Sequence, residues 1–246
     1  MQITTERITV PVDDGSMAAY LARPAEGGPH PAVLVFQEIF GVSGHIRKVT
    51  ERVAAEGYVA CAPEVFHRTA PGIELGYDDA GLQKGMALMA QVKASEAVAD
   101  TRAAIAALEK RPEVGGTGVG AMGFCFGGHL TYLAACELPI AAAASFYGGF
   151  IAVGAPGGET PRTVDRTAKI RGRILCLFGE QDSYIPAEQV AEIKQKLAQH
   201  DIRHEVVVYP GVGHGFFCDE RPDYDRKSAE DAWRRVTTLF REELRS

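Results

Sequence analysis

Several features are scarce in this 246-residue sequence, and each scarcity excludes a class of protein. The sequence holds no block of lysine and arginine long enough to follow a nucleic-acid backbone, and its 32 acidic residues outnumber its 26 basic ones. It also lacks a long apolar segment, because the longest uncharged run, residues 138–158, is rich in alanine and is interrupted by prolines and glycines. We therefore expect neither nucleic acid nor a membrane as a partner.

Cysteines occur without any regular spacing. The five of them are an odd number, and no CxxC pair or Cys/His ligand pattern links them, so the sequence predicts neither a disulfide framework nor a structural metal site. Residues 1–15 lack the apolar stretch of a secretory signal. Both observations favour a location in the reducing cytosol.

What the sequence does contain is a regular alternation of strand and helix patterns. Residues 31–36 form a continuous β-branched-rich run of the kind buried on both faces of a sheet, and residues 43–57 follow as a capped amphipathic helix that ends on glycine. Repeated units of this kind predict a mostly parallel sheet with helices on both faces. Because 46% of the residues are hydrophobic and no linker interrupts the pattern, we expect one α/β domain over residues 1–246.

The other expected elements follow the same alternation, except for an antiparallel hairpin at the N-terminus formed by Ile3–Val12 and Met17–Arg23. Further strands are expected at Tyr58–Ala62, Gly118–Met122, Ile140–Phe146, Arg173–Phe178 and Arg203–Tyr209. Further helices are expected at about Gly81–Lys110, after Gly127, at Ala187–Gln199 and from about Tyr224 to Arg245. The long loop Gly148–Lys169 is expected to be either a flap over the site or a surface excursion.

The stretch GFCFGG places Cys125 between a strand and a helix. Glycines two positions before and after such a residue let the chain turn sharply, so that the side chain stands above the sheet as a nucleophile. The free N–H groups at the start of the following helix would also favour a thiolate. The same motif is also compatible with a small buried cysteine that fills a tight turn between the strand and the helix. The motif alone therefore leaves both interpretations open. The other cysteines have no such elbow; they are Cys61, Cys136, Cys176 and Cys218.

Two further residues complete the chain order nucleophile, acid, histidine. Asp182 lies just after the strand RILCLF, and His214 lies in a glycine-rich loop just after the strand HEVVVY. Because the carboxyl ends of parallel strands meet at one edge of a sheet, we expect the two side chains to lie beside Cys125. The order favours a triad in which the cysteine attacks an acyl carbon, the histidine moves the proton and the aspartate orients the histidine. The backbone N–H of Phe126 is expected to point at the developing oxyanion.

With the stretches QEIFGV, GFCFGG, GEQD and GHGFF, the sequence resembles the dienelactone hydrolase family over nearly its whole length. The resemblance implies an α/β-hydrolase fold that hydrolyses a lactone or ester without a metal or organic cofactor. It also implies a role for Glu38, which matches the glutamate that pairs with the resting cysteine and takes its proton when substrate arrives. The backbone N–H of Ile39 corresponds to the second oxyanion donor.

The sequence differs from the family at the residues that bind the substrate. Family members that open dienelactones hold the substrate carboxylate with arginines, one of them four residues after the catalytic histidine. In this sequence Cys218 stands at that position, Arg221 is the nearby alternative, and Lys84 is the only cation that the sequence offers between residues 77 and 90. Whether the substrate carries a carboxylate therefore stays open.

Aromatic residues near the strand ends either line an apolar pocket or belong to the core. They are Phe40, Phe124, Phe126, Tyr147, Phe216 and Tyr224. Of these, Tyr147 and Phe216 are the candidate substrate contacts.

The sequence thus predicts a hydrolase of a small ester or lactone that works through an acyl-enzyme thioester. Two alternatives stay open. One is a redox-sensing or ligand-binding protein on the same fold, in which Cys125 is a reactive thiol. The other is a hydrolase of a different electrophile, such as a phosphotriester. The protein is expected to work as a monomer or homodimer.

Overall fold

Eight strands form one mixed sheet in the computed structural model, which describes residues 1–244. The order along the sheet is β1-β2-β4-β3-β5-β6-β7-β8. The pairs β1·β2 and β2·β4 are antiparallel, and all the other neighbours are parallel. The predicted mostly parallel sheet with an N-terminal antiparallel hairpin is therefore confirmed. The strands are β1 Ile3–Val12, β2 Gly15–Pro24, β3 His30–Phe36, β4 Val59–Pro63, β5 Val114–Phe124, β6 Ile140–Phe146, β7 Arg173–Gly179 and β8 His204–Tyr209.

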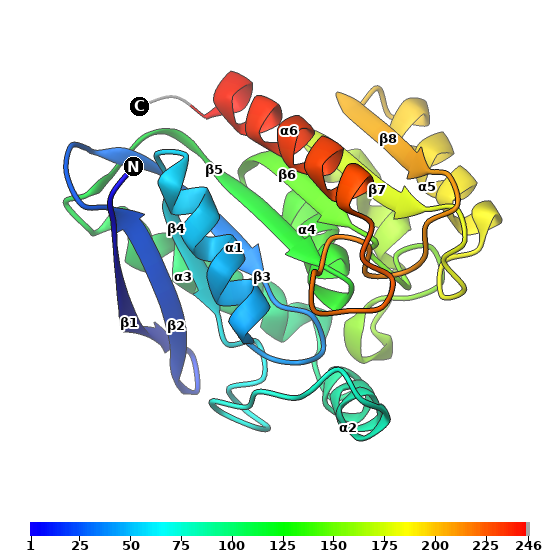
Figure 1. The fold of residues 1–246 in the computed structure, drawn as a ribbon, viewed down its shortest axis with the longest axis horizontal. Helices are drawn as coiled ribbons and strands as arrows, with labels where there is room; N and C mark the ends of the chain where they lie inside the picture. The colour runs from blue at the N-terminus through cyan, green and yellow to red at the C-terminus, as the bar shows by residue number, and fades with distance from the viewer. Residues whose placement is uncertain (245–246) are drawn as a thin grey trace.

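Helices cover both faces of this sheet, as Figure 1 shows. α1 and α6 lie on one face and α3, α4 and α5 on the other, whereas α2 lies off the sheet beyond the carboxyl ends of the strands. Within residues 1–244, no helix is long and apolar enough to cross a membrane. The helices are α1 Gly44–Ala55, α2 Asp79–Met89, α3 Ala94–Glu109, α4 Phe126–Glu137, α5 Ala187–Gln199 and α6 Arg226–Glu243, with 3₁₀ turns at Pro156–Gly158 and Thr163–Lys169.

The central strands are buried on both faces, which explains why their sequences are continuous apolar runs rather than alternating ones. In β3 every residue after His30 is buried, and β6 and β7 are almost as fully covered. Parallel pairing brings the carboxyl ends of β3, β5, β7 and β8 to the same edge of the sheet. The segments that follow these four strands therefore meet at that edge.

The expected single helix over Gly81–Lys110 is wrong, because the structure divides this stretch into α2 and α3. A carboxylate from a distant loop stabilises the start of α3: Glu159 accepts hydrogen bonds from the backbone N–H of Ser95 at 3.0 Å and from its hydroxyl at 2.6 Å. The helical pattern of the sequence is continuous across the break, so only these tertiary contacts reveal it. The last helix begins at Arg226, after the N-cap Asp225, and the end expected for it at Arg245 lies outside the described residues.

The long segment between β6 and β7 packs on α4. His129 hydrogen-bonds the Thr163 hydroxyl at 2.6 Å, and Tyr132 hydrogen-bonds the Thr167 hydroxyl at 2.7 Å, and all four side chains are buried. Of the two expectations for Gly148–Lys169, the structure therefore favours a packed excursion over a free flap.

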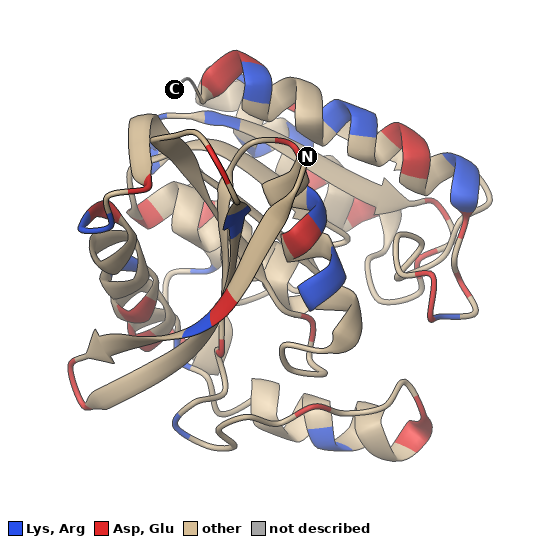
Figure 2. Cartoon of the chain, turned by 60° about the vertical axis from the view of Figure 1, so that its left-hand side comes forward, with Lys and Arg blue, Asp and Glu red and all other residues tan. Residues whose placement is uncertain are grey.

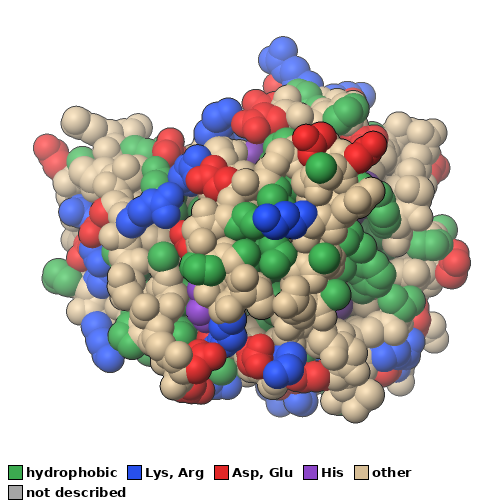
Figure 3. Space-filling view, turned by 90° about the horizontal axis from the view of Figure 1, so that it is seen from below, with side chains coloured by type: hydrophobic (Ala, Val, Ile, Leu, Met, Phe, Trp, Pro, Cys, Tyr) green, Lys and Arg blue, Asp and Glu red, His purple; other side chains and the backbone are tan. Residues whose placement is uncertain are grey.

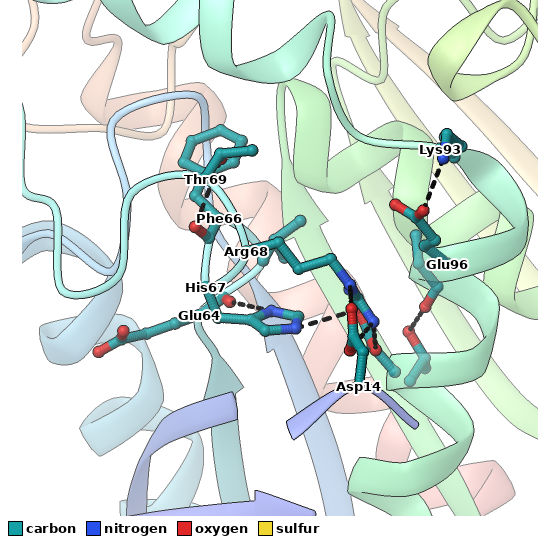
Figure 4. A network of polar contacts seen from close by, with 12 residues as sticks. Asp14, Glu64, Phe66, His67, Arg68, Thr69, Lys93 and Glu96 are labelled. Atoms are coloured by element: carbon teal, nitrogen blue, oxygen red, sulfur yellow. Dashed lines mark hydrogen bonds and ion pairs between the residues drawn. The ribbon is translucent and has the colours of Figure 1, made fainter. Parts of the chain in front are cut away.

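Ion pairs fasten the outer elements to this core. Charged residues of both signs are distributed along the helices (Figure 2). In Figure 4, Arg68 in the turn after β4 donates to Asp14 in the β1–β2 turn, with Nε 2.6 Å from Oδ2. The same guanidinium donates from Nη2 to Oδ1 of Asp100 on α3 at 2.9 Å. Arg68 thus ties the edge hairpin to a helix on the back of the sheet.

Candidate active site

Cys125 stands on a sharp turn between β5 and α4. Its backbone has φ 55° and ψ −116°, and residues other than glycine rarely adopt such a positive φ. A Cβ on Gly123 would lie 2.3 Å from the carbonyl oxygen of Gly127, and one on Gly127 would lie 2.4 Å from the carbonyl oxygen of Phe36. The elbow therefore requires both glycines, because any side chain at either position would collide with backbone.

Asp182 and His214 form a buried, hydrogen-bonded pair. The His214 Nδ1 lies 2.7 Å from the Asp182 Oδ2, and the other carboxylate oxygen accepts the backbone N–H of Tyr184 at 2.9 Å. This geometry orients the imidazole and leaves Nε2 as its reactive nitrogen. The rings of Tyr147 and Tyr184 lie 5.0 and 5.1 Å from the imidazole and hold it in place.

The His214 imidazole and the Cys125 thiol line the same pocket. Burial lowers the pKa of His214, but its interactions with Cys125 and Asp182 more than offset that effect and raise the pKa to about 10. The remaining four cysteines are buried, and burial raises the pKa of each thiol.

Glu38 is fully buried just beyond β3, and neither of its oxygens is bonded to the cysteine. Arg221 donates from Nη1 to Oε1 at 3.0 Å, and the Tyr77 hydroxyl donates to Oε2 at 3.2 Å. The carboxylate is thus held by an arginine and a tyrosine while Cys125 faces His214. The expected pairing of Glu38 with the cysteine stays a prediction, because it requires an exchange of these partners.

Arg221 reaches the site because Gly215 has no side chain. Gly215 has φ +86°, and a Cβ there would lie 2.7 Å from the guanidinium Nη1. The guanidinium carbon also lies 5.9 Å from the ring centres of Phe40 and of Tyr77. Packing and pairing together fix this arginine in one place, although it stands three residues later than the family's arginine. Cys218, which occupies the family position, is buried.

The two residues expected to supply the oxyanion donors lie in different segments. Phe126 is the first residue of α4, where the N–H groups have no partner within the helix. Ile39 lies in the segment after β3, and both residues line the same pocket as Cys125. Their role as oxyanion donors stays a prediction.

The pocket in front of Cys125 opens to solvent, and its empty space, with the open solvent at its mouth included, is about 730 Å³. Cys125, His214 and Arg221 lie at its floor, and α2 with the segment before it forms one wall. Most residues of this wall were not predicted from the sequence. The spacing of apolar residues along a helix does not distinguish those that face a pocket from those that face the core. The lining residues are Ile39, Phe40, Tyr77, Asp78, Asp79, Leu82, Met86, Met89, Cys125, Phe126, Gly149, Phe150, Tyr184, His214 and Arg221.

Three of the expected substrate contacts do not line this pocket. Tyr147 and Phe216 are fully buried behind His214, with ring centres 5.3 Å apart, so they are core residues that support the site. Lys84 is exposed on α2 and is not among the residues that line the pocket. Among the expected aromatic residues, Phe40 and Phe126 do line the pocket, whereas Phe124 is core and Tyr224 lies on the surface near α1.

Within residues 1–244, no group of three or more histidine, cysteine, aspartate or glutamate side chains is arranged to hold a metal ion.

Comparisons with known proteins point to one family. The model of the dienelactone hydrolase family matches residues 17–244. A Synechocystis protein described as "Putative carboxymethylenebutenolidase" is 44% identical over 245 residues, covering 100% of this chain and 99% of its own length. A protein of Escherichia coli K12 with the same description is 38% identical and covers 95% of this chain and 85% of its own. The crystal structure of a Klebsiella pneumoniae protein, described as "Putative Dienelactone Hydrolase", superposes with a TM-score of 0.88 at 32% identity, over 98% of this chain and 100% of that one.

Proposed function

Because this chain belongs to the dienelactone hydrolase family, we propose that it hydrolyses a small ester or lactone with Cys125 as the nucleophile. The observation that carries the proposal is the alignment of Cys125, His214 and Asp182 on one edge of the sheet, with the thiol and the imidazole facing the same pocket. The alternative of a merely reactive thiol gives no reason for a histidine fixed by an aspartate in that position.

The reaction begins when the Cys125 thiolate attacks the carbonyl carbon and forms a carbon–sulfur bond. The carbonyl oxygen becomes an oxyanion, which the N–H groups of Ile39 and Phe126 stabilise. When the tetrahedral intermediate collapses, the carbon–oxygen bond to the leaving alkoxide breaks and the His214 imidazolium protonates it. In a lactone the leaving group remains attached to the acyl chain.

The second half of the reaction removes the acyl group. His214, now neutral, takes a proton from water, and the hydroxide attacks the thioester carbon. The carbon–sulfur bond breaks, the carboxylic acid leaves, and the thiolate–imidazolium pair forms again. Asp182 stays ionised throughout and keeps the imidazole in its orientation.

Glu38 enters this scheme as the expected acceptor of the thiol proton in a resting state. To reach Cys125, its carboxylate must leave Arg221 or Tyr77. The interaction of Cys125 with His214 supports direct ionisation of the thiol by the histidine in the arrangement described above.

The decisive experiment replaces the nucleophile. We expect Cys125→Ala to lower kcat/KM for a 4-nitrophenyl ester and for a butenolide by about 10⁴-fold or more, because no other group can form the acyl-enzyme. Intact-mass spectrometry of the native protein after brief mixing with the ester is expected to show one acyl adduct, which the variant lacks. The adduct accumulates only if deacylation is slower than acylation, so kcat/KM is the primary measurement.

Two further variants control this test. Cys61→Ala changes a buried thiol in β4 and is expected to retain activity, whereas His214→Ala is expected to lose turnover by about 10³-fold or more. Full activity in Cys125→Ala would disprove the proposed nucleophile. Full activity in His214→Ala would instead favour a reactive thiol that does not need a base.

A further inference from the structure

We propose that Phe150 is a specificity-determining residue: its ring binds an apolar group of the substrate, so that the site prefers esters or lactones that carry such a group. This inference rests on the proposed hydrolysis at Cys125 and names a feature of the substrates of that site. It follows from the exposure of Phe150, from its backbone conformation and from the apolar side chains that line the same pocket.

Phe150 exposes an aromatic ring at the pocket. Six large apolar side chains are exposed among residues 1–244, and two of them, Phe150 at 44% and Tyr184 at 49%, line this pocket. The ring of Tyr184 already packs against His214, with ring centres 5.1 Å apart. An exposed ring gains free energy when an apolar ligand covers it. Phe150 is therefore the better candidate for a residue that serves the substrate alone.

The backbone of Phe150 is strained. Its φ is 65°, in the left-handed region that a residue with a side chain rarely adopts. Glycine adopts this region without strain, and the two residues before Phe150, Gly148 and Gly149, are both glycines. Strained residues of this kind are concentrated at active sites and at sites that clamp a ligand. A phenylalanine in this conformation at the pocket therefore indicates a role in binding.

The turn that carries Phe150 is fixed on both sides. Its carbonyl oxygen accepts the N–H groups of Val153 at 3.1 Å and of Gly154 at 3.0 Å. Before the turn, Gly148 packs on the first turn of α4, where a Cβ on Gly128 would lie 2.9 Å from the Gly148 Cα. A ring on a fixed backbone has little conformational freedom to lose when a ligand binds. The position of Phe150 is thus set relative to the helix that starts at the nucleophile.

The pocket offers further apolar surface to the same ligand. Leu82, Met86 and Met89 of α2 form its apolar wall, and Gly149 and Phe150 line it from another segment, after β6. Methionine side chains adapt to ligands of different shape, and aromatic rings pack well against flat apolar groups. In Figure 3, which shows the face where α2 lies, hydrophobic side chains gather around the middle of the surface among scattered charges. A phenyl group is a suitable ligand for this surface.

The test compares esters with and without a phenyl group. On the acyl side, 4-nitrophenyl 3-phenylpropanoate is compared with 4-nitrophenyl propanoate, and on the alcohol side, 2-phenylethyl acetate is compared with ethyl acetate. Each kcat/KM is divided by the hydroxide-catalysed rate constant of the same ester, so the ratio within a pair measures how the phenyl group stabilises the transition state. We expect a phenyl preference of at least tenfold in one pair or in both. A preference below tenfold in both pairs overturns the inference.

Two variants remove the ring without straining the backbone. Glycine and asparagine both tolerate a positive φ, so Phe150→Gly and Phe150→Asn are expected to fold. We expect each to lower the phenyl preference at least fivefold. Val153→Ala is the matched control, because it shortens a side chain that is 53% exposed in the same turn and is not among the residues that line the pocket. It is expected to keep the native preference.

Three outcomes of this comparison overturn the role of Phe150. They are a native preference in both ring variants, an equal loss of kcat/KM on both esters of a pair, and a fall in Val153→Ala as large as in the ring variants.

The failure of this inference is separable from the failure of the proposed function. If Cys125→Ala loses activity while the native protein shows no phenyl preference, only the specificity is wrong. If Cys125→Ala remains fully active, or the native protein hydrolyses none of the four esters and no butenolide, the proposed function fails and the inference falls with it.

Discussion

His129 lies one helical turn after Cys125 and fixes the opposite wall of the pocket without touching a substrate. Its Nε2 hydrogen-bonds Thr163 at 2.6 Å, and its ring also bonds the backbone of Gly149, which lines the pocket. Burial lowers the pKa of this imidazole to about 4. The neutral ring is therefore part of the structure that holds the long excursion against α4.

This residue gives a pH dependence of stability with a defined sign. The pKa in the folded protein, about 4, is below the ordinary 6.5, so the unfolded chain binds more protons between these values. The contribution is complete above pH 6.5 and is lost as the pH falls toward 4, by roughly 3 kcal/mol in all. Denaturant unfolding from pH 4 to 7 is expected to show a weaker pH dependence for His129→Gln than for the native protein.

The matched control is His200→Gln, which changes an exposed histidine at the end of α5 and is expected to keep the native profile. Parallel profiles for the native protein and His129→Gln would contradict the assignment.

At this scale the sequence located the three residues of the proposed triad better than the side chains around them. Cys125, Asp182 and His214 could be predicted to lie close together because each follows a strand, and the carboxyl ends of parallel strands meet at one edge of the sheet. The pairing of Glu38 with Arg221 could not be predicted, because it depends on the turn that returns Arg221 toward Gly215. Tyr147 was assigned to the pocket because it follows β6, but its backbone conformation, with φ 36°, accompanies a ring buried behind His214.

Among the secondary-structure elements, α2 packs on the segment that carries Ile39, one of the two expected oxyanion donors. A Cβ on Gly85 would lie 2.5 Å from the carbonyl oxygen of Ile39, so the helix backbone rests directly on the segment that carries this oxyanion donor. A Cβ on Gly81 would lie 2.0 Å from the carbonyl oxygen of Gly76. These two glycines fix how far the apolar wall stands from Cys125.

Gly85→Ala tests this contact. We expect it to displace α2 or the Ile39 peptide, with a loss of about 1–3 kcal/mol in the free energy of unfolding from overpacking. Because the oxyanion donor moves, kcat is expected to fall by about tenfold or more. Steady-state kinetics and urea unfolding measure both effects.

Gly154→Ala provides the comparison, since a Cβ there meets nothing within 4 Å. It is expected to retain both activity and stability. Native kcat in Gly85→Ala would show that α2 does not set the position of Ile39.

The structure has two helices, α2 and α3, where one long helix was expected. They show why the ends of helices could not be predicted from the sequence. Ala90–Lys93 contains no glycine or proline, so nothing local ends a helix there. Glu159, from a loop more than sixty residues away, stabilises the start of α3, and the glycines of α2 hold that helix on a different surface. The spacing of apolar residues along the sequence carries no information about contacts between residues this far apart in the chain.

At the scale of the whole molecule, one sheet runs from β1 to β8 without a gap, and buried residues extend along it on both faces. The mostly parallel sheet with helices on both faces could be predicted from the sequence, because apolar strands that alternate with helices leave few arrangements. The order of the strands in the sheet was not predicted. We propose that residues 1–246 form one folding unit, since no described element can leave without exposing apolar surface of its neighbours.

Thermal unfolding tests this proposal. The single tryptophan, Trp233, lies on α6 near Phe217, so its fluorescence reports on one face of the sheet, whereas far-ultraviolet circular dichroism reports on all elements. We expect both signals to change in one transition with the same midpoint, and the calorimetric and van't Hoff enthalpies to agree. Separate midpoints would indicate two units.

The distribution of the cysteines has a practical consequence for the purified protein. Four of the five thiols lie in the core, and only Cys125 opens toward solvent through the pocket. A chromogenic disulfide reagent will therefore react with one equivalent per folded chain and with five after denaturation. The count before denaturation measures the fraction of chains in a folded preparation whose Cys125 thiol is free, so every rate constant can be expressed per competent molecule.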